Sequence, residues 1–483
     1  MKKLTLAAAG LLMIAFAGAG KISMPHVFTD NMVLQADTVA AIWGRATPGA
    51  RVTASGSWGA SASAKADSEG RWRLGLRTPE ASYEPLSLTV SDGADKDAVT
   101  LNNVLAGEVW ICSGQSNMEM VLDGFRNQPV EGAGEEITFA RRLGRGIRFV
   151  KVPRNGSYEP QEDFDGQWQE CLPHTIGRLS ALAWFYGQAL RDILDRPVGL
   201  VTNAYGGTPV EGYVPVEIAS AYPDINIGYE KRPDTEISEW HKASKFYYAM
   251  VLPVAGYTAR GFLWNQGETN VYRRHTDYPG RQADMLREWR RLWRNDDMPF
   301  YFVEIPAWEY SGVDNTEAAY FREQQHLAAD STHNAWIVST ADLARADEPD
   351  DIHPRNKRPI GNRLAALAAT YTYNIKGIPH TFPRYRSWRK DGDGAAVVYF
   401  DNADTGFTPN ENLCGFEVAG ADRVFRPAKA EISRERGAIR VTSDDVADIR
   451  AVRYLFRNFY IGRVHDLHGM PVMPFRTDDW PAK

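Results

Sequence analysis

The segment Cys112–Met118 places a serine, Ser116, shortly after the apolar run Val109–Ile111. Open parallel sheets bind ligands just outside the carboxyl ends of their strands, so a serine at this point would be displayed to a substrate. A helix that begins at Ser116 would also direct free backbone N–H groups at developing negative charge. The pattern indicates a nucleophile for acyl transfer. Taken alone, the segment fits a serine that merely caps a helix equally well.

A second candidate segment is Asp350–Pro354, which contains Asp351 and His353. Proline at a first helical position fixes a helix start, and the apolar spacing that follows predicts an amphipathic helix (Ile360, Leu364, Leu367). A carboxylate two or three residues before the histidine can hold one ring nitrogen, which leaves the other to accept a serine proton. The alternative is a pair of N-capping aspartates beside an incidental surface histidine.

Two further segments follow apolar runs. Asn203–Pro209 contains the pair Gly206 and Gly207, whose backbone can approach a ligand closely and donate N–H groups to it. Trp264–Asn270 supplies a cluster of side-chain amides that could stabilise an oxyanion or bind sugar hydroxyls. A plain loop and a turn are the respective alternatives. Together the four segments meet the requirements of an acyl-transfer site.

The secondary structure expected from the sequence changes along the chain. Apolar strands alternate with helical segments from Val104 to about Tyr373, with helices expected over residues 179–194 and 278–292, which predicts a parallel α/β sheet. Short β-rich runs precede and follow this part. We therefore expect four parts: a signal peptide (1–19), an N-terminal β domain (20–103), an α/β catalytic domain (104–379) and a C-terminal β region (380–483).

The first residues predict export. Lys2 and Lys3 precede an apolar stretch, Leu4–Phe16, and the small residues 17–19, as in a cleavable signal peptide for the periplasm or secretion. The stretch is shorter than the roughly 20 apolar residues of a membrane anchor, so no anchor is expected. The net charge of −6 over 483 residues offers no basic surface for nucleic acid, which excludes that class of partner.

These segments together resemble the sialate O-acetylesterase family, a branch of the SGNH hydrolases. The resemblance also includes residues 28–35, 107–110 and 474–478, so it spans almost the whole chain after the signal peptide. It implies a flavodoxin-like parallel sheet core between N- and C-terminal β-sandwich-like regions. The implied reaction is removal of O-acetyl groups from sialic acids, with acetylated carbohydrate as the substrate, Ser116 as nucleophile and His353 as base.

The resemblance carries further residue roles. It places the Gly207 N–H and the Gln266 side chain beside the Ser116 N–H in the oxyanion hole, and it implies no metal and no cofactor. The wider class has its acid three residues before the histidine, which selects Asp350. The nearer family pattern selects Asp351, which we favour, and some relatives use a backbone carbonyl instead. Arg273 and Arg274 could bind a sialate carboxylate, although solvated arginine pairs are commoner.

Two alternatives stay open at this point. The same chemistry could deacetylate xylan or another glycan, since the sequence does not choose the sugar. A protein of another class, a non-catalytic carbohydrate-binding protein, would not need the intact Ser116 and His353. A lipase is disfavoured because the candidate loops are polar and aromatic and no apolar lid-like stretch occurs.

Overall fold

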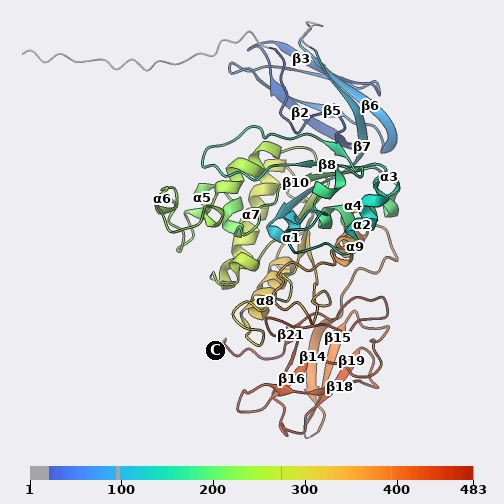
Figure 1. Cartoon of the computed structure of the whole chain (residues 1–483), viewed down its shortest axis with the longest axis vertical. Helices are drawn as coiled ribbons and strands as arrows, with labels where there is room; N and C mark the ends of the chain where they lie inside the picture. The colour runs from blue at the N-terminus through green and yellow to red at the C-terminus, as the bar shows by residue number, and fades with distance from the viewer. Residues whose placement is uncertain (1–20, 94–97, 274, 393, 482–483) are drawn as a thin grey trace, which may run out of the picture.

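A mostly parallel sheet lies at the centre of the molecule (Figure 1). The structure is a computed structural model that describes residues 21–93, 98–273, 275–392 and 394–481, so the expected signal peptide lies outside the described residues. The strands run in the order β13-β12-β11-β7-β10-β8, all parallel, with β9 antiparallel at the edge. Their bounds are Val99–Gly114 (β7), Ile147–Lys151 (β8), Gln169–Glu170 (β9), Val198–Thr202 (β10), Gly261–Asn265 (β11), Phe300–Val303 (β12) and Ala335–Val338 (β13).

Helices cover both faces of this sheet, which explains why its strands are apolar throughout rather than alternating. On one face Trp110 of β7 packs edge-on against Tyr186 of α4 (Ala181–Leu194). On the other face Trp264 of β11 packs against Trp289 of α7 (Tyr278–Trp293). The expected α/β core is therefore confirmed, and both predicted helices form within two residues of their expected bounds.

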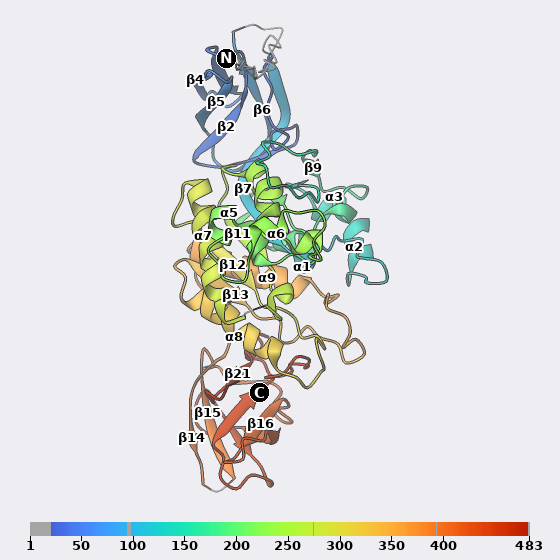
Figure 2. The ribbon, with the colours of Figure 1, turned by 90° about the vertical axis from the view of Figure 1, so that its left-hand side faces the viewer.

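Two more helices complete the layers. Helix α9 (Arg358–Leu367) lies on α4, where a Cβ at Gly361 would collide with the backbone of Tyr186. Helix α8 (Glu317–Asp330) packs beside α7. Short helical segments follow strand ends or connect them (Figures 1 and 2), with bounds Ser116–Glu119 (α1), Ala133–Thr138 (α2), Ala140–Leu143 (α3), Val216–Ala219 (α5) and Ile227–Glu230 (α6).

The helix predicted to start at Pro354 begins later. Residues 354–357 are not helical, and Pro359 rather than Pro354 occupies the first turn of α9. This segment stays non-helical because two of its groups form tertiary hydrogen bonds. The Arg355 carbonyl accepts from the Glu131 N–H, and the Lys357 ammonium donates to the Asn117 side chain. The apolar face predicted for the helix is correct, since Ile360, Leu364 and Leu367 are all buried.

The N-terminal strands form antiparallel ladders that continue into β7. Strands β3, β6 and β7 pair in sequence, β1 adds to β7 in parallel, and β2 pairs with β5. Strand β7 runs through the division expected between residues 103 and 104, with Asn103 at a left-handed φ of 55°. That division stays a prediction. The bounds are Val33–Gln35 (β1), Val39–Arg45 (β2), Arg51–Gly56 (β3), Ser61–Lys65 (β4), Arg71–Arg77 (β5) and Ser82–Ser91 (β6).

The C-terminal strands form two four-stranded sheets that share an apolar core at the opposite end of the molecule (Figure 2). One sheet has the order β14-β15-β19-β18 and the other β17-β16-β20-β21, and their inward residues include Val398 and Val418. The bounds are Arg384–Lys390 (β14), Ala395–Asp401 (β15), Phe416–Ala419 (β16), Arg426–Pro427 (β17), Lys429–Ile432 (β18), Ala438–Thr442 (β19), Ala451–Tyr454 (β20) and Phe475–Arg476 (β21).

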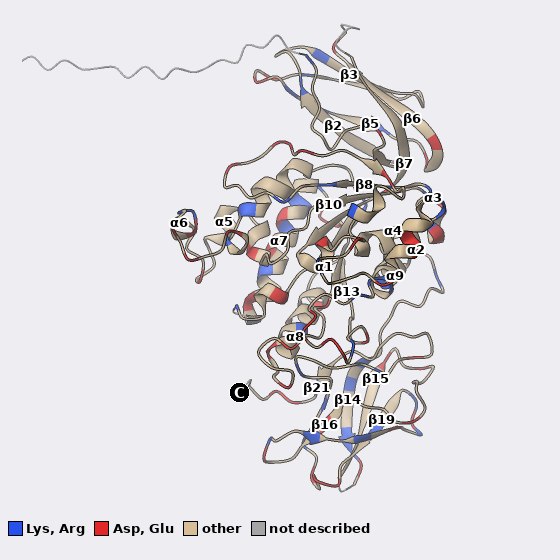
Figure 3. Ribbon diagram, in the orientation of Figure 1, with Lys and Arg blue, Asp and Glu red and all other residues tan. Residues whose placement is uncertain are grey.

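Acidic and basic residues are interspersed along the ribbon in the view of Figure 3, over all three parts of the molecule. Within the described part of the chain, no helix has the length and apolar character needed to span a bilayer.

Candidate active site

Strand order brings three of the predicted segments to one edge of the sheet. Strand β7 lies between β10 and β11, and all three run in parallel, so the segments that follow them emerge together. Gly114 at the end of β7 has a φ of 138°, and a Cβ there would collide with the Asn265 carbonyl at the end of β11. The N–H of Gln115 donates to that same carbonyl at 2.9 Å. These contacts fix the turn that leads into α1.

Ser116 is the first residue of α1 and is partly exposed to solvent. The glycine pair after β10 lies against it: a Cβ at Gly206 would stand 3.3 Å from the Cβ of Ser116. Gly207 adopts a φ of 77°, which an L side chain rarely allows. Among the described residues, no acceptor takes the N–H of Ser116 or of Gly207. Both donors are therefore available to a ligand beside the serine hydroxyl.

His353 is held by an amide rather than by a carboxylate. Its Nδ1 lies 3.0 Å from Oε1 of Gln128. The Nε2 of Gln128 donates to Oδ1 of Asp351 at 3.2 Å, so the amide presents its oxygen to the ring, and this orientation assigns the proton to Nδ1 of His353. The other ring nitrogen, Nε2, is buried and has no hydrogen-bond partner within the described ranges.

The direct contact expected between an aspartate and the imidazole is therefore absent from the described residues. Asp351 instead accepts from the backbone N–H of His353 at 2.9 Å and from Gln128. Asp350 is exposed. The short Asp351 side chain is already engaged by the N–H two residues later, an arrangement that commonly stabilises turns, so it does not bond the ring.

The electrostatic surroundings keep His353 neutral. Burial lowers the pKa of His353 to about 4, and the nearby charge of Lys357 contributes to the shift. Phe125 packs edge-on against the imidazole with ring centroids 5.2 Å apart. An imidazole with a protonated Nδ1 and an uncharged, buried Nε2 is a proton acceptor at neutral pH.

Asn117 ties the nucleophile segment to the histidine segment. Its Nδ2 donates to the Ile352 carbonyl at 3.0 Å, so the residue after Ser116 is bound to the residue before His353. Nδ2 also lies 2.5 Å from Oε1 of Glu268, and Oδ1 accepts from the Lys357 ammonium at 2.5 Å. Lys357 is fully buried, and burial lowers its pKa to about 8. This buried network determines how the two segments meet.

Gln266 is placed differently from its expected role as an oxyanion donor. Its side chain is fully buried, and Nε2 donates to the Thr208 carbonyl at 3.0 Å and to Oδ1 of Asn270 at 2.7 Å. Both amide hydrogens thus have acceptors within the protein. In this arrangement Gln266 supports the loop that carries Gly207 instead of offering a donor to a ligand.

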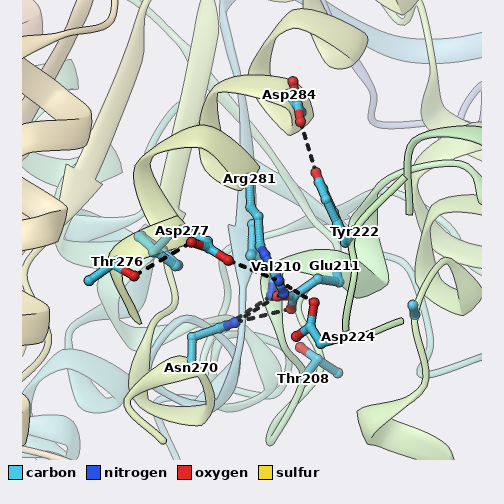
Figure 4. Close-up of polar contacts among 12 residues, drawn as sticks. Thr208, Val210, Glu211, Tyr222, Asp224, Asn270, Thr276, Asp277, Arg281 and Asp284 are labelled. Carbon is cyan, nitrogen blue, oxygen red and sulfur yellow. Dashed lines mark hydrogen bonds and ion pairs between the residues drawn. The ribbon is translucent and has the colours of Figure 1, made fainter. Parts of the chain in front are cut away.

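A buried ion pair between Glu211 and Arg281 fixes Asn270, the residue that accepts from Gln266 (Figure 4). Nδ2 of Asn270 donates to both carboxylate oxygens of Glu211, at 3.1 and 3.0 Å, and the Arg281 guanidinium of α7 binds Glu211 and Asp224. Glu211 follows the glycine pair by a few residues, so the network joins the loop after β10 to the loop after β11. The side chains of Glu211, Asn270 and Arg281 are buried, so removal of the guanidinium would leave the Glu211 carboxylate without a counter-charge among the described residues.

The structure thus brings Ser116, Gly207, Asp351 and His353 to one place and leaves Asp350 outside. Gln128 is the residue that sequence reasoning missed. It lies between Asn127 and Pro129, far from any strand end and 225 positions before His353, and no local pattern marks it. Arg273 is partly exposed, and Arg274 lies outside the described residues. The described residues contain no group of three or more His, Cys, Asp or Glu side chains that could hold a metal ion.

Comparison with known proteins relates the chain to carbohydrate esterases. Residues 232–370 match the family model described as carbohydrate esterase, sialic acid-specific acetylesterase. Human sialate O-acetylesterase is 27% identical over 389 residues, covering 73% of this chain and 72% of the relative, and the mouse protein is 26% identical over 412 residues. The crystal structure of a carbohydrate acetylesterase from Xanthomonas citri superposes with a TM-score of 0.81 and 28% identity, over 95% of this chain and 100% of the other.

The fold is similar to that of carbohydrate esterases of the SGNH hydrolase type. The chain is a carboxylic ester hydrolase with carbohydrate O-acetylesterase activity, and the resemblance to the sialate O-acetylesterase family seen in its motifs is confirmed. The alternative of a non-catalytic carbohydrate-binding protein is set aside by the same findings.

Proposed function

We propose that Ser116 and His353 hydrolyse the acetyl esters of a carbohydrate through an acetyl-enzyme intermediate. The observation that carries this proposal is the state of the imidazole: Nδ1 is bonded to Gln128, and Nε2 is buried without a partner. An imidazole prepared in this way accepts a proton at Nε2 alone. Asn117 holds the serine and histidine segments together, which supports the pairing of the two residues.

In the first half of the reaction, the hydroxyl oxygen of Ser116 attacks the acetyl carbonyl carbon while its proton passes to Nε2 of His353. The tetrahedral intermediate then expels the sugar oxygen, which takes the proton from Nε2, and an acetyl ester remains on Ser116. In the second half, water attacks this ester and gives its proton to Nε2. Collapse of this second tetrahedral intermediate returns that proton to the Ser116 oxygen and releases acetic acid, which ionises to acetate.

The oxyanion of both intermediates would be stabilised by the N–H groups of Ser116 and Gly207, because neither has another acceptor among the described residues. Backbone donors held by a turn and a helix start are already oriented before the charge develops. We assign Gln266 and Asn270 to the support of that turn, and Gln128 with Asp351 to the orientation of the imidazole.

The substrate that we propose is an O-acetylated sialic acid. The matching family model is described as sialic acid-specific, and the mammalian relatives are named sialate O-acetylesterases. The second candidate is an acetylated xylan or another acetylated glycan, since the structural relative from Xanthomonas citri is described only as a carbohydrate acetylesterase. Acetate release from O-acetylated sialic acid and from acetylated xylo-oligosaccharides, measured side by side, distinguishes the two. A higher kcat/KM on the xylo-oligosaccharides would overturn the sialate assignment.

We also propose that the chain is exported through its first 19 residues. The lysine pair, the apolar stretch and the small residues 17–19 support this. Expression of the full chain in a bacterium, followed by fractionation and N-terminal sequencing, tests it. A periplasmic product that begins near residue 20 is expected, and an uncleaved cytoplasmic product would contradict export.

A further inference from the structure

A cleft of about 980 Å³ lies beside the proposed nucleophile. Its lining includes Glu119, at the end of α1 three residues after Ser116, and Phe125, the ring that packs on His353. A Cβ at Gly206 would stand 3.2 Å from the Glu119 carboxylate and 3.3 Å from the Cβ of Ser116, so Glu119, which lines the cleft, lies close to the serine. This volume is in the range of cavities that hold small ligands.

Three cations line the same cleft: Lys151, Arg154 and Arg178. Lys151 is the last residue of β8, where it pairs with Thr202 at the carboxyl end of β10, so it lies at the edge of the sheet from which Ser116 emerges. Burial lowers the pKa of Lys151. The Glu119 carboxylate opposes this shift, and the charges of Arg154 and Arg178 add to it, because these charged groups share one hollow.

The carboxylates around the cleft offset these three cations only in part. Glu119 is already engaged, because it forms a two-point ion pair with Arg154 and accepts the Gly206 N–H at 2.8 Å. His26, also in the lining, is bonded to Asp163. Asp165 is exposed. Within the described ranges, Lys151 and Arg178 have neither a hydrogen bond nor an ion pair from their side chains, so the hollow carries excess positive charge.

The carboxylate that acts on the half-buried Lys151, Glu119, is already paired with Arg154, so an anionic ligand would offset part of the free-energy cost of burying the lysine. We infer that this cleft binds a carboxylate on the sugar that carries the acetyl ester, with Lys151 and Arg178 as its partners. The inference rests on the proposed role of Ser116, since the cleft serves the substrate of that serine. Arg154 is instead a positioning residue, which holds Glu119 and stacks 5.1 Å over the Tyr205 ring.

Two kinds of sugar carry such a carboxylate, the sialic acids and the uronic acids. The experiment therefore uses an O-acetylated sialic acid, an O-acetylated glucuronic acid, and the methyl ester of the carboxyl group of each. Acetate release is measured, so hydrolysis of the methyl ester itself does not interfere. The wild-type enzyme should prefer each acid that fits the cleft over its methyl ester by about 10-fold or more in kcat/KM, the factor expected for a charge-assisted hydrogen bond. The acid with the larger preference identifies the source of the carboxylate.

The substitutions Lys151→Gln and Arg178→Gln should each reduce that preference towards one, mainly through KM. Lys429→Gln, which removes a lysine that is 78% exposed on β18, is the matched control and should leave the preference unchanged. Equal kcat/KM for acid and methyl ester in the wild type, or an unchanged preference in both cleft variants, would overturn the inference. If p-nitrophenyl acetate and the neutral esters are still hydrolysed in that case, the proposed function stands. Failure on every acetyl ester would overturn both.

Discussion

Nδ1 of His353 lies 3.0 Å from Oε1 of Gln128, and Gln128 in turn donates to Asp351. The aspartate therefore reaches the imidazole through a neutral amide rather than by direct contact. This chain fixes the ring and its tautomer without placing a full negative charge beside it.

Gln128→Ala should lower kcat for acetyl ester hydrolysis by at least about 10-fold, but by less than the roughly 10⁴-fold loss seen when a direct acid is replaced and the tautomer is wrong. KM should change little, because Gln128 orients the base and is not proposed to touch the sugar. Steady-state kinetics on one acetylated sugar measure both constants. A variant with wild-type kcat would show that another group orients His353.

The pH profile of kcat/KM tests the state of the base. His353 acts as a base only when it is neutral, and its pKa is lowered to about 4, so activity should persist below pH 6 and be lost as the pH falls through about 4. Gln128→Glu would place a carboxylate beside Nδ1, which favours the charged imidazole and should move the loss of activity to higher pH. An acidic limb near pH 6.5 in the wild type would contradict a buried, neutral His353.

The two neighbouring aspartates should behave differently. Asp351→Ala removes the acceptor for both the His353 N–H and the Gln128 amide, so kcat should fall by about 10-fold or more. Asp350→Ala should remain close to wild type in kcat, since this side chain is exposed. Rates measured at matched folded fractions separate catalysis from stability. A larger loss in Asp350→Ala would mean that the acid lies three residues before the histidine after all.

Comparison of the sequence with the structure shows which parts of the site are predictable from sequence. Ser116 and Gly207 follow apolar strands, and the parallel sheet brings such strand ends together, so their proximity follows from local pattern and topology. No local sequence pattern identifies Gln128, because its role depends on contact with His353, 225 positions later in the sequence. The exact use of Gln266 was equally hidden, since the choice between a ligand and the Thr208 carbonyl depends on the direction of a buried amide.

The helices also differ in how well the sequence predicts them. Periodicity predicted α4 and α7 closely, because the buried face of each repeats every three to four residues. The predicted start of α9 was wrong because Pro354 suggested a helix start, whereas the tertiary hydrogen bonds of Arg355 and Lys357 accompany a non-helical segment. Tertiary hydrogen bonds to a distant loop therefore override the local helix propensity of this segment.

The buried network of Figure 4 should contribute stability as well as position. Arg281→Gln leaves the buried Glu211 carboxylate without a counter-charge among the described residues and should lower the free energy of unfolding by about 3–5 kcal/mol. Arg287→Gln, on the same helix but 73% exposed, is the control and should change it by less than about 1 kcal/mol. Chemical denaturation measures both. Equal effects in the two variants would show that the ion pair does not stabilise the loops after β10 and β11.

Ser116 forms the acetyl-enzyme in the proposed mechanism, and replacement of that one hydroxyl is the most direct test of this role. Ser116→Ala should reduce acetate release from an O-acetylated sugar by at least about 10³-fold, with an unchanged melting temperature because the side chain is partly exposed and makes no hydrogen bond among the described residues. The wild-type enzyme, quenched in acid during turnover, should carry an acetyl group on the peptide that contains residue 116. Retention of wild-type turnover in Ser116→Ala would contradict the account.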